Sequence, residues 1–416
     1  MLFDFRAHSS LLLPAVVTGI VTTGWLLFRA LRRSTLTDAL LALLLVVPTL
    51  SIAQQMLVYA GWYDSHDGYT TALFYVPWQL NLLLGPAYYL YFRSLTSQEF
   101  RLFPRAWLHL LPGLLQFGLV AGALGYDLLW PAGAGGQHQP YQVGTKGPAL
   151  VAAEGVAHYL GYAQYVLLPA YCWRVLANYR RYTRYLHDNF SDTERLRFAG
   201  LRQLLLVQVL ALVLSQLFTL VDWKVGLSDA ASWNYFFLRG ILVYWLIAVG
   251  LQANYAAATT PLRFDATPDP PLTPEPAAES NPAAAAPTTQ ASLEGEPTAQ
   301  LAPELLAWRD KLLALMDEEQ PWLEPELTLT ELAKRLRITP GLLSKVINSG
   351  CGQNFNDFVN AYRVREAQRL LADPRFAHYS LVGVALESGF NSRSTFNRVF
   401  KRMVGQAPSE LTRPKT

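Results

Sequence analysis

Arginine, asparagine and serine side chains crowd the stretch GFNSRSTFNRVFK, which runs from residue 389 to residue 401. Gly389 suits the φ > 0 position that ends one helix, and Ser392 suits the cap that begins the next. Phe396, Phe400 and Met403 then share one apolar helix face. Arginine and asparagine can pair with base edges in the DNA major groove, and lysine can contact phosphate. The spacing therefore predicts DNA contact through the opposite, outward face: Arg393, Ser394, Asn397, Arg398 and Lys401.

The segment LTLTELAKRLRITPGLLSKVIN shows the same helix–turn–helix plan earlier in the chain. Thr328 and Glu331 have the spacing of a capping box, and Thr339 followed by Pro340 suits the start of a second helix. One such unit is weak support for DNA binding, because helix–turn–helix units also serve only for packing. Two in tandem favour DNA contact over the alternative of solvated surface charges. The outward face of this first unit holds Gly341, Ser344, Lys345 and Asn348.

The elements that must position these two units are helical by pattern. An amphipathic helix includes Leu305, and a longer helix of about residues 354–371 separates the two units. Further helices are expected near residues 381–388 and 393–403, with a last short one from about Pro408. No strand pattern appears, so this part of the chain is predicted to be a small all-α domain.

Apolar stretches fill the first part of the chain, although the whole sequence carries a net charge of +3. Each approaches the ~20 residues that a bilayer core requires. The first has its basic residues after the apolar run, so we expect an anchor rather than a cleaved signal. A bundle of seven transmembrane helices is predicted, at residues 10–30, 36–60, 72–92, 105–126, 150–173, 200–222 and 232–254.

Lysine and arginine in the connections indicate the orientation, because positively charged loops stay cytoplasmic. The first, third and fifth connections carry thirteen arginines, whereas the opposite side carries only Arg6, Lys146 and Lys224. We therefore expect a multi-pass protein of the inner (cytoplasmic) membrane, with its N-terminus outside and its C-terminal domain in the cytoplasm.

Proline, alanine, threonine and glutamate dominate residues 261–303, where Phe264 is the only aromatic residue. This composition cannot bury enough apolar surface to offset the chain entropy lost on folding. We therefore expect a disordered linker there. It would join a seven-span membrane sensor domain of residues 1–260 to the helical domain of residues 304–416.

The connection before the sixth stretch has a helix-start signal of its own. Ser191 and Glu194 have capping-box spacing within SDTERLRFAGLRQLLLV. This spacing predicts that the sixth helix begins in the cytoplasm, well before it enters the bilayer.

Catalytic and metal-binding patterns are missing from the printed sequence. Cys172 and Cys351 lie in unrelated contexts, and the seven histidines have no ligand spacing. There is also no glycine-rich phosphate loop and no nucleophile elbow. We therefore expect no enzyme activity and no cofactor.

Arg239 lies inside the last predicted span, where an ionised side chain is costly unless it is paired or hydrated. Its candidate partners are Glu154 and Asp222, and a bound anionic ligand would also serve. A structural ion pair and a ligand site both remain open at this point.

The C-terminal domain resembles the AraC/XylS family of transcription regulators. The resemblance rests on LAKRLRITPGLLSKVIN, FVNAYRVREAQRLL and VALESGFNSRSTFNRVFKRMVGQAPSEL, about a quarter of the chain. It implies that the helix of residues 354–371 holds two recognition helices against successive major grooves. It also implies base reading by Gly341, Ser344 and Lys345, and in the second unit by Arg393, Ser394, Asn397 and Arg398.

Two features depart from that family's pattern. Arg337 stands where the family often has glycine in the first turn, and the first recognition helix has few long polar side chains. Specificity is therefore expected to rest on the second unit. The apolar half is similar in architecture to the seven-span regions of some AraC-type regulators of the Bacteroidetes type, which implies a sensor role.

Two classes of function follow from these patterns. The first is a membrane-anchored, sequence-specific regulator that couples an extracytoplasmic or membrane signal to transcription. Its partners would be double-stranded DNA, membrane lipid, a small-molecule or envelope signal, and a second copy of the chain. The alternative is a membrane transporter or enzyme with a C-terminal helical adaptor, which would not require a basic recognition helix.

Overall fold

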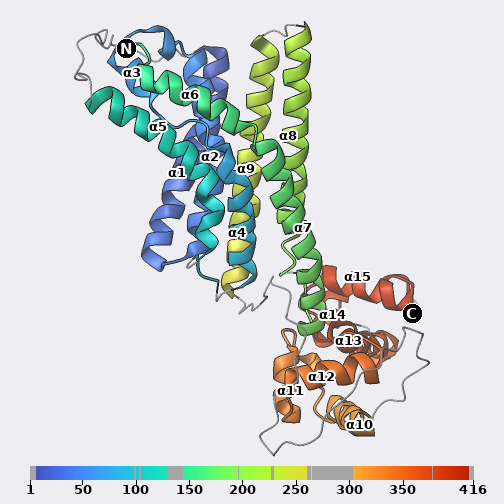
Figure 1. The fold of residues 1–416 in the computed structure, drawn as a ribbon. Helices are drawn as coiled ribbons and strands as arrows, with labels where there is room; N and C mark the ends of the chain where they lie inside the picture. The colour runs from blue at the N-terminus through green and yellow to red at the C-terminus, as the bar shows by residue number, and fades with distance from the viewer. Residues whose placement is uncertain are drawn as a thin grey trace, which may run out of the picture. The chain divides into compact units, whose positions relative to one another are not determined.

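The computed structural model describes residues 6–97, 100–102, 105–129, 144–194, 196–225, 229–259, 264, 303–376 and 378–411. These residues form helices and connections with no strand among them, as the all-α prediction requires. The chain separates into two compact units (Figure 1). Unit 1 comprises residues 1–182 and 198–266, and unit 2 comprises residues 183–197 and 267–416.

Long apolar helices build unit 1. Their bounds are α1 Ala7–Arg33, α2 Leu36–Tyr59, α3 Gly68–Phe74, α4 Leu84–Thr96, α5 Leu111–Leu129, α6 Pro148–Gly161, α7 Gln164–Asn189, α8 Ala199–Val225 and α9 Asp229–Thr259. The final residues of α7, from Thr183 onward, belong to unit 2.

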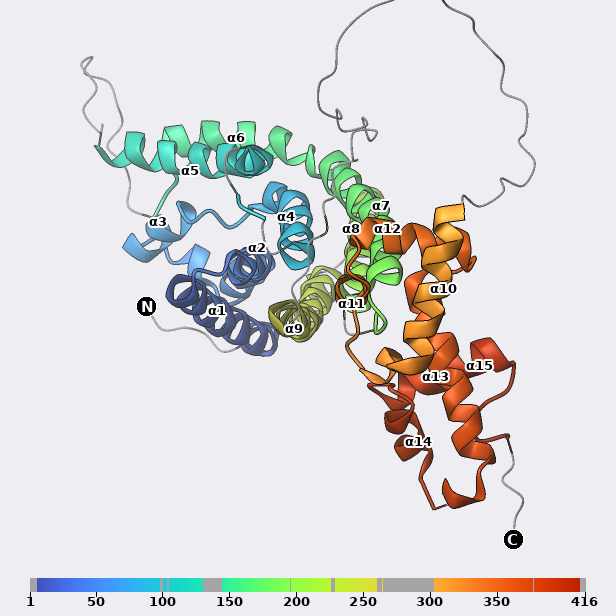
Figure 2. The ribbon, with the colours of Figure 1, turned by 90° about the horizontal axis from the view of Figure 1, so that it is seen from below.

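Close helix packing in unit 1 centres on α2. Helices α1 and α9 both pack against α2, and the three lie side by side in both ribbon views (Figures 1 and 2). Gly19 of α1 faces Thr49 of α2, and a Cβ at Gly19 would lie 2.3 Å from the threonine Oγ1. Gly250 of α9 faces Leu41 of α2 in the same way. The missing side chains therefore let the helix backbones approach each other.

Helices occur in all seven stretches predicted as spans, but they are not seven uniform spans. Among the described residues, four helices are long and apolar enough to cross a bilayer: Ala7–Arg33, Leu36–Tyr59, Ala106–Asp127 and Trp233–Ala253.

The third and fifth predicted spans are interrupted helices. In the third, α3 ends at Phe74 shortly before Pro77, because a residue that precedes proline disfavours helical geometry. Helix α4 then supplies only 13 residues. In the fifth, α6 ends at Gly161 and α7 begins at Gln164.

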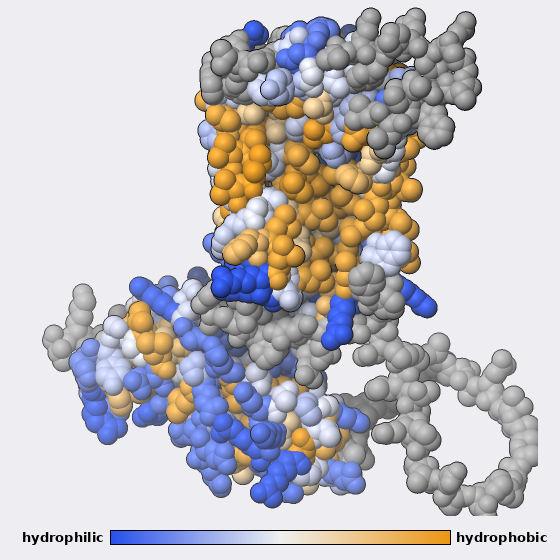
Figure 3. Space-filling view, turned by 90° about the vertical axis from the view of Figure 1, so that its left-hand side faces the viewer, coloured by the Kyte–Doolittle hydropathy of each residue, from blue (hydrophilic) through white to orange (hydrophobic). Residues whose placement is uncertain are grey.

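The surface of unit 1 carries a broad belt of apolar side chains (Figure 3). Large apolar residues are exposed on several of its helices, among them Leu31 of α1, Leu115 of α5 and Leu210 of α8. A soluble monomer rarely exposes so extensive an apolar surface. Contact of this belt with lipid would remove the apolar groups from water.

Unit 2 holds two hydrophobic cores, one at the N-terminal half and one at the C-terminal half of the long helix α13 Phe355–Ala372. The first core includes Leu312, Leu332, Leu343 and Ile347, and the second includes Phe390, Phe396 and Phe400. Its other helices are α10 Pro303–Glu318, α11 Leu329–Leu336, α12 Pro340–Lys345, α14 Leu381–Glu387 and α15 Arg393–Val404.

The prediction that the sixth helix starts at Ser191 is wrong, because α8 begins only at Ala199. The Ser191 hydroxyl accepts from Arg363 and its backbone N–H donates to Leu327, so tertiary contacts replace the local cap. The short helix expected from Pro408 is a turn in the structure. The predicted linker lies outside the described residues except at its ends, where Phe264 is buried and α10 begins at Pro303.

Candidate nucleic-acid interface

The second helix–turn–helix unit has the predicted caps. Gly389 adopts φ +80° in the turn between α14 and α15. The Ser392 hydroxyl accepts from the backbone N–H of Thr395, so it caps α15 as expected. Phe396 and Phe400 are fully buried beneath the helix. The opposite face of α15 is thereby fixed toward the surface.

The outward residues of α15 lie where the sequence placed them. The side chains of Arg393, Ser394, Arg398 and Lys401 are exposed, and that of Asn397 is half-buried. Arginine, asparagine and lysine in this arrangement can contact base edges and phosphates. Contact with DNA itself stays a prediction.

The first helix–turn–helix unit also has its predicted local geometry. Thr328 and Glu331 form both hydrogen bonds of the capping box at the start of α11. Arg337 ends α11 in the left-handed region at φ 56°, where glycine would be less strained. The Thr339 hydroxyl then accepts from Leu342 N–H and caps α12.

The outward face of the first helix–turn–helix unit has smaller and less charged side chains than that of α15. Helix α12 continues as a π-helical turn over Val346–Gly350. Gly341, Lys345 and Asn348 are exposed, and the Asn348 amide donates to Ser344 Oγ at 3.3 Å. One lysine is the only charged group of this predicted reading face, so it can supply less base discrimination than α15.

A buried arginine on α13 joins the two helix–turn–helix units. Arg363 is 1% exposed, and its guanidinium donates to the carbonyl oxygens of Trp322 at 2.8 Å and Glu324 at 2.7 Å. Its Cζ also lies 5.9 Å from the ring centroid of Phe390, in the second core. Burial lowers the pKa of Arg363 to about 10, so it remains charged at neutral pH. The charge is therefore held by backbone carbonyl groups.

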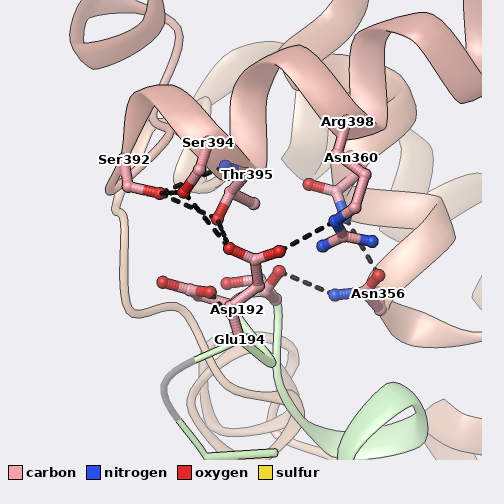
Figure 4. Close-up of polar contacts among 9 residues, drawn as sticks. Asp192, Glu194, Asn356, Asn360, Ser392, Ser394, Thr395 and Arg398 are labelled. Carbon is pink, nitrogen blue, oxygen red and sulfur yellow. Dashed lines mark hydrogen bonds and ion pairs between the residues drawn. The ribbon is translucent and has the colours of Figure 1, made fainter. Parts of the chain in front are cut away.

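The sequence patterns did not identify an acidic contact on the reading face of α15. The carboxylate of Glu194 accepts from Arg398 Nε at 2.8 Å and from Thr395 Oγ1 at 2.9 Å (Figure 4). Glu194 comes from the connection after α7, and this part of the connection belongs to unit 2. Because the partners are some two hundred residues apart in the chain, no local pattern could reveal the contact.

The polar residues that hold this connection were also missed. Asn356 and Asn360 on α13 are almost fully buried, and the Asn356 amide donates to the backbone oxygens of Phe190 and Ser191. Asn356, Asn360 and Arg363 lie at i, i+4 and i+7, so they share one face of α13. This polar stripe was the available sequence signal for a docked segment. A helix face that packs only against its own domain core would carry apolar residues at these positions.

The predicted membrane site divides into separate features of unit 1. Arg239 lies over the Tyr235 ring, with 5.6 Å from Cζ to the ring centroid, and pairs with no acidic group in the described part of the chain. Glu154 pairs instead with Lys146 at 2.7 Å, so the structure does not bring Glu154 and Arg239 together. The side chain of Asp222 lies outside the described residues.

Arg239 faces a cavity of about 330 Å³ in unit 1. Carboxamide side chains make up much of its polar lining, including Gln55, Gln79, Asn81 and Gln208. Asn81 Oδ1 is buried and has no hydrogen-bond partner among the described residues. Aliphatic and aromatic residues, among them Leu168, Leu242 and Phe236, form much of the remaining wall. The cavity thus combines one cation, neutral polar groups and apolar surface.

The fold of unit 2 defines a tandem helix–turn–helix domain. Residues 332–414 match a family described as "Helix-turn-helix domain". The chain is also similar to the HTH-type transcriptional regulator GlxA of Rhizobium meliloti (strain 1021), with 30% identity over 102 residues, 24% of this chain and 31% of that protein.

Two further relatives match over a similar region. An uncharacterized HTH-type transcriptional regulator of Bacillus subtilis (strain 168), YtdP, is 32% identical over 22% of this chain and 12% of its own length. One from Staphylococcus aureus (strain COL) is 28% identical over 24% of this chain and 13% of its own length. The chain therefore spans less than a third of each of these relatives. No solved structure matches the chain.

Proposed function

We propose that this protein is a membrane-anchored, sequence-specific transcription regulator of the AraC type. The observation that carries the proposal is the pair of capped helix–turn–helix units on one long helix, with exposed basic and amide side chains on α15. The match of residues 332–414 and the names of the relatives support DNA binding by unit 2.

DNA selection by the full-length chain tests this proposal. The protein in lipid nanodiscs is mixed with a pool of random-sequence duplexes, and the bound fraction is sequenced. Enrichment of a defined sequence is expected, with affinity that falls at least tenfold between ~0.05 M and ~0.2 M salt as counterions are released. Binding without any sequence enrichment would remove specific regulation, and an absence of binding would favour the adaptor alternative.

Membrane anchoring by unit 1 is the second part of the proposal. Four helices of spanning length and the exposed apolar belt support it, and the arginine-rich connections favour a cytoplasmic unit 2. The seven-span topology, an N-terminus outside and the inner membrane remain part of this proposal. Cysteine labelling from each side of intact cells would test the orientation.

The cavity beside Arg239 is the proposed signal site. Arg239 has no acidic partner among the described residues, a guanidinium in an apolar helix is costly, and the surrounding carboxamides are neutral, so an anion would stabilise the charge. The apolar walls favour a ligand with a carboxylate or phosphate head and a short hydrocarbon part. A second copy of the chain and the surrounding lipid are further proposed partners.

A further inference from the structure

The Glu194 carboxylate lies against the first turn of α15 (Figure 4). Besides Arg398 and Thr395, it accepts from Ser394 Oγ at 3.4 Å. Ser394 and Arg398 are two of the residues predicted to contact DNA. The carboxylate therefore binds two of the five α15 residues predicted to contact DNA.

A carboxylate and a phosphate compete for such a position on physical grounds. Both are anions that accept from guanidinium and hydroxyl groups, and the N-terminus of a helix attracts either one. Arg398 keeps four further N–H groups, so DNA would compete with Glu194 for the Nε–H, and the carboxylate charge would repel a phosphate at the same place. This argument rests on the proposed DNA-binding function.

The segment that carries Glu194 is fixed to unit 2 by several hydrogen bonds. The backbone N–H of Ser191 donates to Leu327 O at 3.2 Å, and the Asn356 amide donates to Ser191 O at 2.7 Å. The Arg363 guanidinium donates to Ser191 Oγ at 3.1 Å. Phe190 and Thr328 form an isolated antiparallel bridge. These contacts hold the chain immediately before Glu194 in an ordered position.

We propose that residues 190–194 form an autoinhibitory segment that covers part of the reading face of α15 through Glu194. Helix α7 runs without interruption from Gln164 to Asn189 and leads directly into this segment. A ligand that changes the position or stability of α7 would thereby favour or oppose release of α15. Unit 1 is thus connected to unit 2 through α7 as well as through the linker before α10, and a signal could pass along α7.

The charge-neutral variant Glu194→Gln tests the segment in the full-length chain in nanodiscs. The probe is a fluorescent duplex of the sequence enriched from the random pool, or of random sequence if none is enriched, and affinity is measured by anisotropy. Glutamine keeps one acceptor oxygen but carries no charge, so loss of the partly exposed ion pair and of the second acceptor is expected to tighten DNA binding about fivefold.

The matched control is Glu387→Gln, which removes the same charge from an exposed position on α14. The control should alter affinity less than about twofold, since it changes only long-range, screened repulsion. Equal tightening by both variants would overturn the proposal, because general charge and not the contact would then explain the effect.

Hydrogen exchange gives a second readout in the unmodified chain. Saturating duplex should speed amide exchange over residues 190–194, because DNA displaces the segment. Unchanged exchange together with normal DNA binding would overturn the autoinhibitory segment and leave the proposed function intact. Failure of both the unmodified chain and Glu194→Gln to bind any duplex would overturn both.

Discussion

The backbone oxygen of Trp322 accepts from the buried Arg363 guanidinium, with 2.8 Å between Nε and O, and this contact joins the two helix–turn–helix units. Trp322 belongs to the first hydrophobic core, whereas Arg363 lies on α13 beside Phe390 of the second. Arg363 therefore adds a buried polar link between two hydrophobic cores that both pack on α13.

Replacement of Arg363 by methionine should destabilise unit 2 by about 3 kcal/mol. The aliphatic side chain keeps much of the volume but leaves the Trp322 and Glu324 oxygens without their buried donor. Amide exchange of α13 in the full-length chain measures the loss. Arg369→Met, at an exposed arginine paired with Glu366, should cost less than about 0.5 kcal/mol.

Gly389→Ala should destabilise unit 2 by at least ~2 kcal/mol, since it combines left-handed strain with a backbone clash. At φ +80°, a Cβ would lie 2.5 Å from the Trp322 oxygen. Gly405 is the matched control, because it has φ +85° and no atom within 4 Å of a Cβ. Gly405→Ala should therefore cost only the conformational ~1 kcal/mol. Equal losses in the two variants, measured by exchange, would contradict the packing argument.

The local elements of unit 2 could be predicted from the sequence because each carries its own start and stop signal. The capping box at Thr328, the cap at Ser392 and the glycine at residue 389 each act within a few residues. The outward faces of α12 and α15 then follow from the positions of buried residues such as Leu343 and Phe396.

Contacts between distant segments could not be predicted in the same way. Ser191 and Glu194 show the spacing of a capping box, yet Ser191 binds α13 and Glu194 binds α15. Local propensity therefore loses to tertiary hydrogen bonds at this connection. In unit 1, apolar composition located the helices but not their ends. Pro77 is a local signal for the break after α3. The break at Tyr162 has no such signal, so it depends on geometry that composition does not encode.

Base discrimination should depend more on Arg393 than on Lys345. Arg393→Ala removes a group that can donate two hydrogen bonds to guanine, so the preference for the enriched sequence over random duplex should fall by about 1–3 kcal/mol. Lys345→Ala should weaken both duplexes alike and reduce the salt slope by about one. Anisotropy titrations at several salt concentrations distinguish the two effects. A specificity loss confined to Lys345→Ala would assign base reading to the first unit.

His187, near the end of α7, makes the autoinhibitory segment sensitive to pH. Burial lowers the pKa of His187, and Arg197 and Arg402 lower it further, whereas Asp357 and a hydrogen bond with Asn356 raise it. When the segment is released, His187 regains its ordinary pKa of about 6.5. Between the lowered pKa and about pH 6.5, the released histidine is therefore protonated while the docked histidine is neutral. The docked state is therefore fully stable above about pH 6.5 and loses stability as the pH falls toward the lowered value.

DNA affinity should accordingly rise between about pH 7.5 and about pH 5.5 as the segment is released. His187→Gln should remove most of this rise, because glutamine does not titrate. His378→Gln, at an exposed histidine of unit 2, should preserve it. Anisotropy titrations across this range check the result, and the same pH response in both variants would exclude His187 as its source.

Octanoate and octyl phosphate should raise the unfolding temperature of the full-length chain in nanodiscs of uncharged lipid, whereas octanol should not. The reason is that only the two anions can pair with Arg239, while all three compounds can contact the apolar wall near Leu242. Arg239→Gln should abolish the shift, and Arg32→Gln, at an exposed arginine of α1, should preserve it. Stabilisation by octanol of the same size would show that the cavity recognises hydrocarbon alone. A shift with octyl phosphate but not octanoate would instead narrow the ligand class to phosphate-bearing molecules, since the two probes share a chain and differ in the charged head.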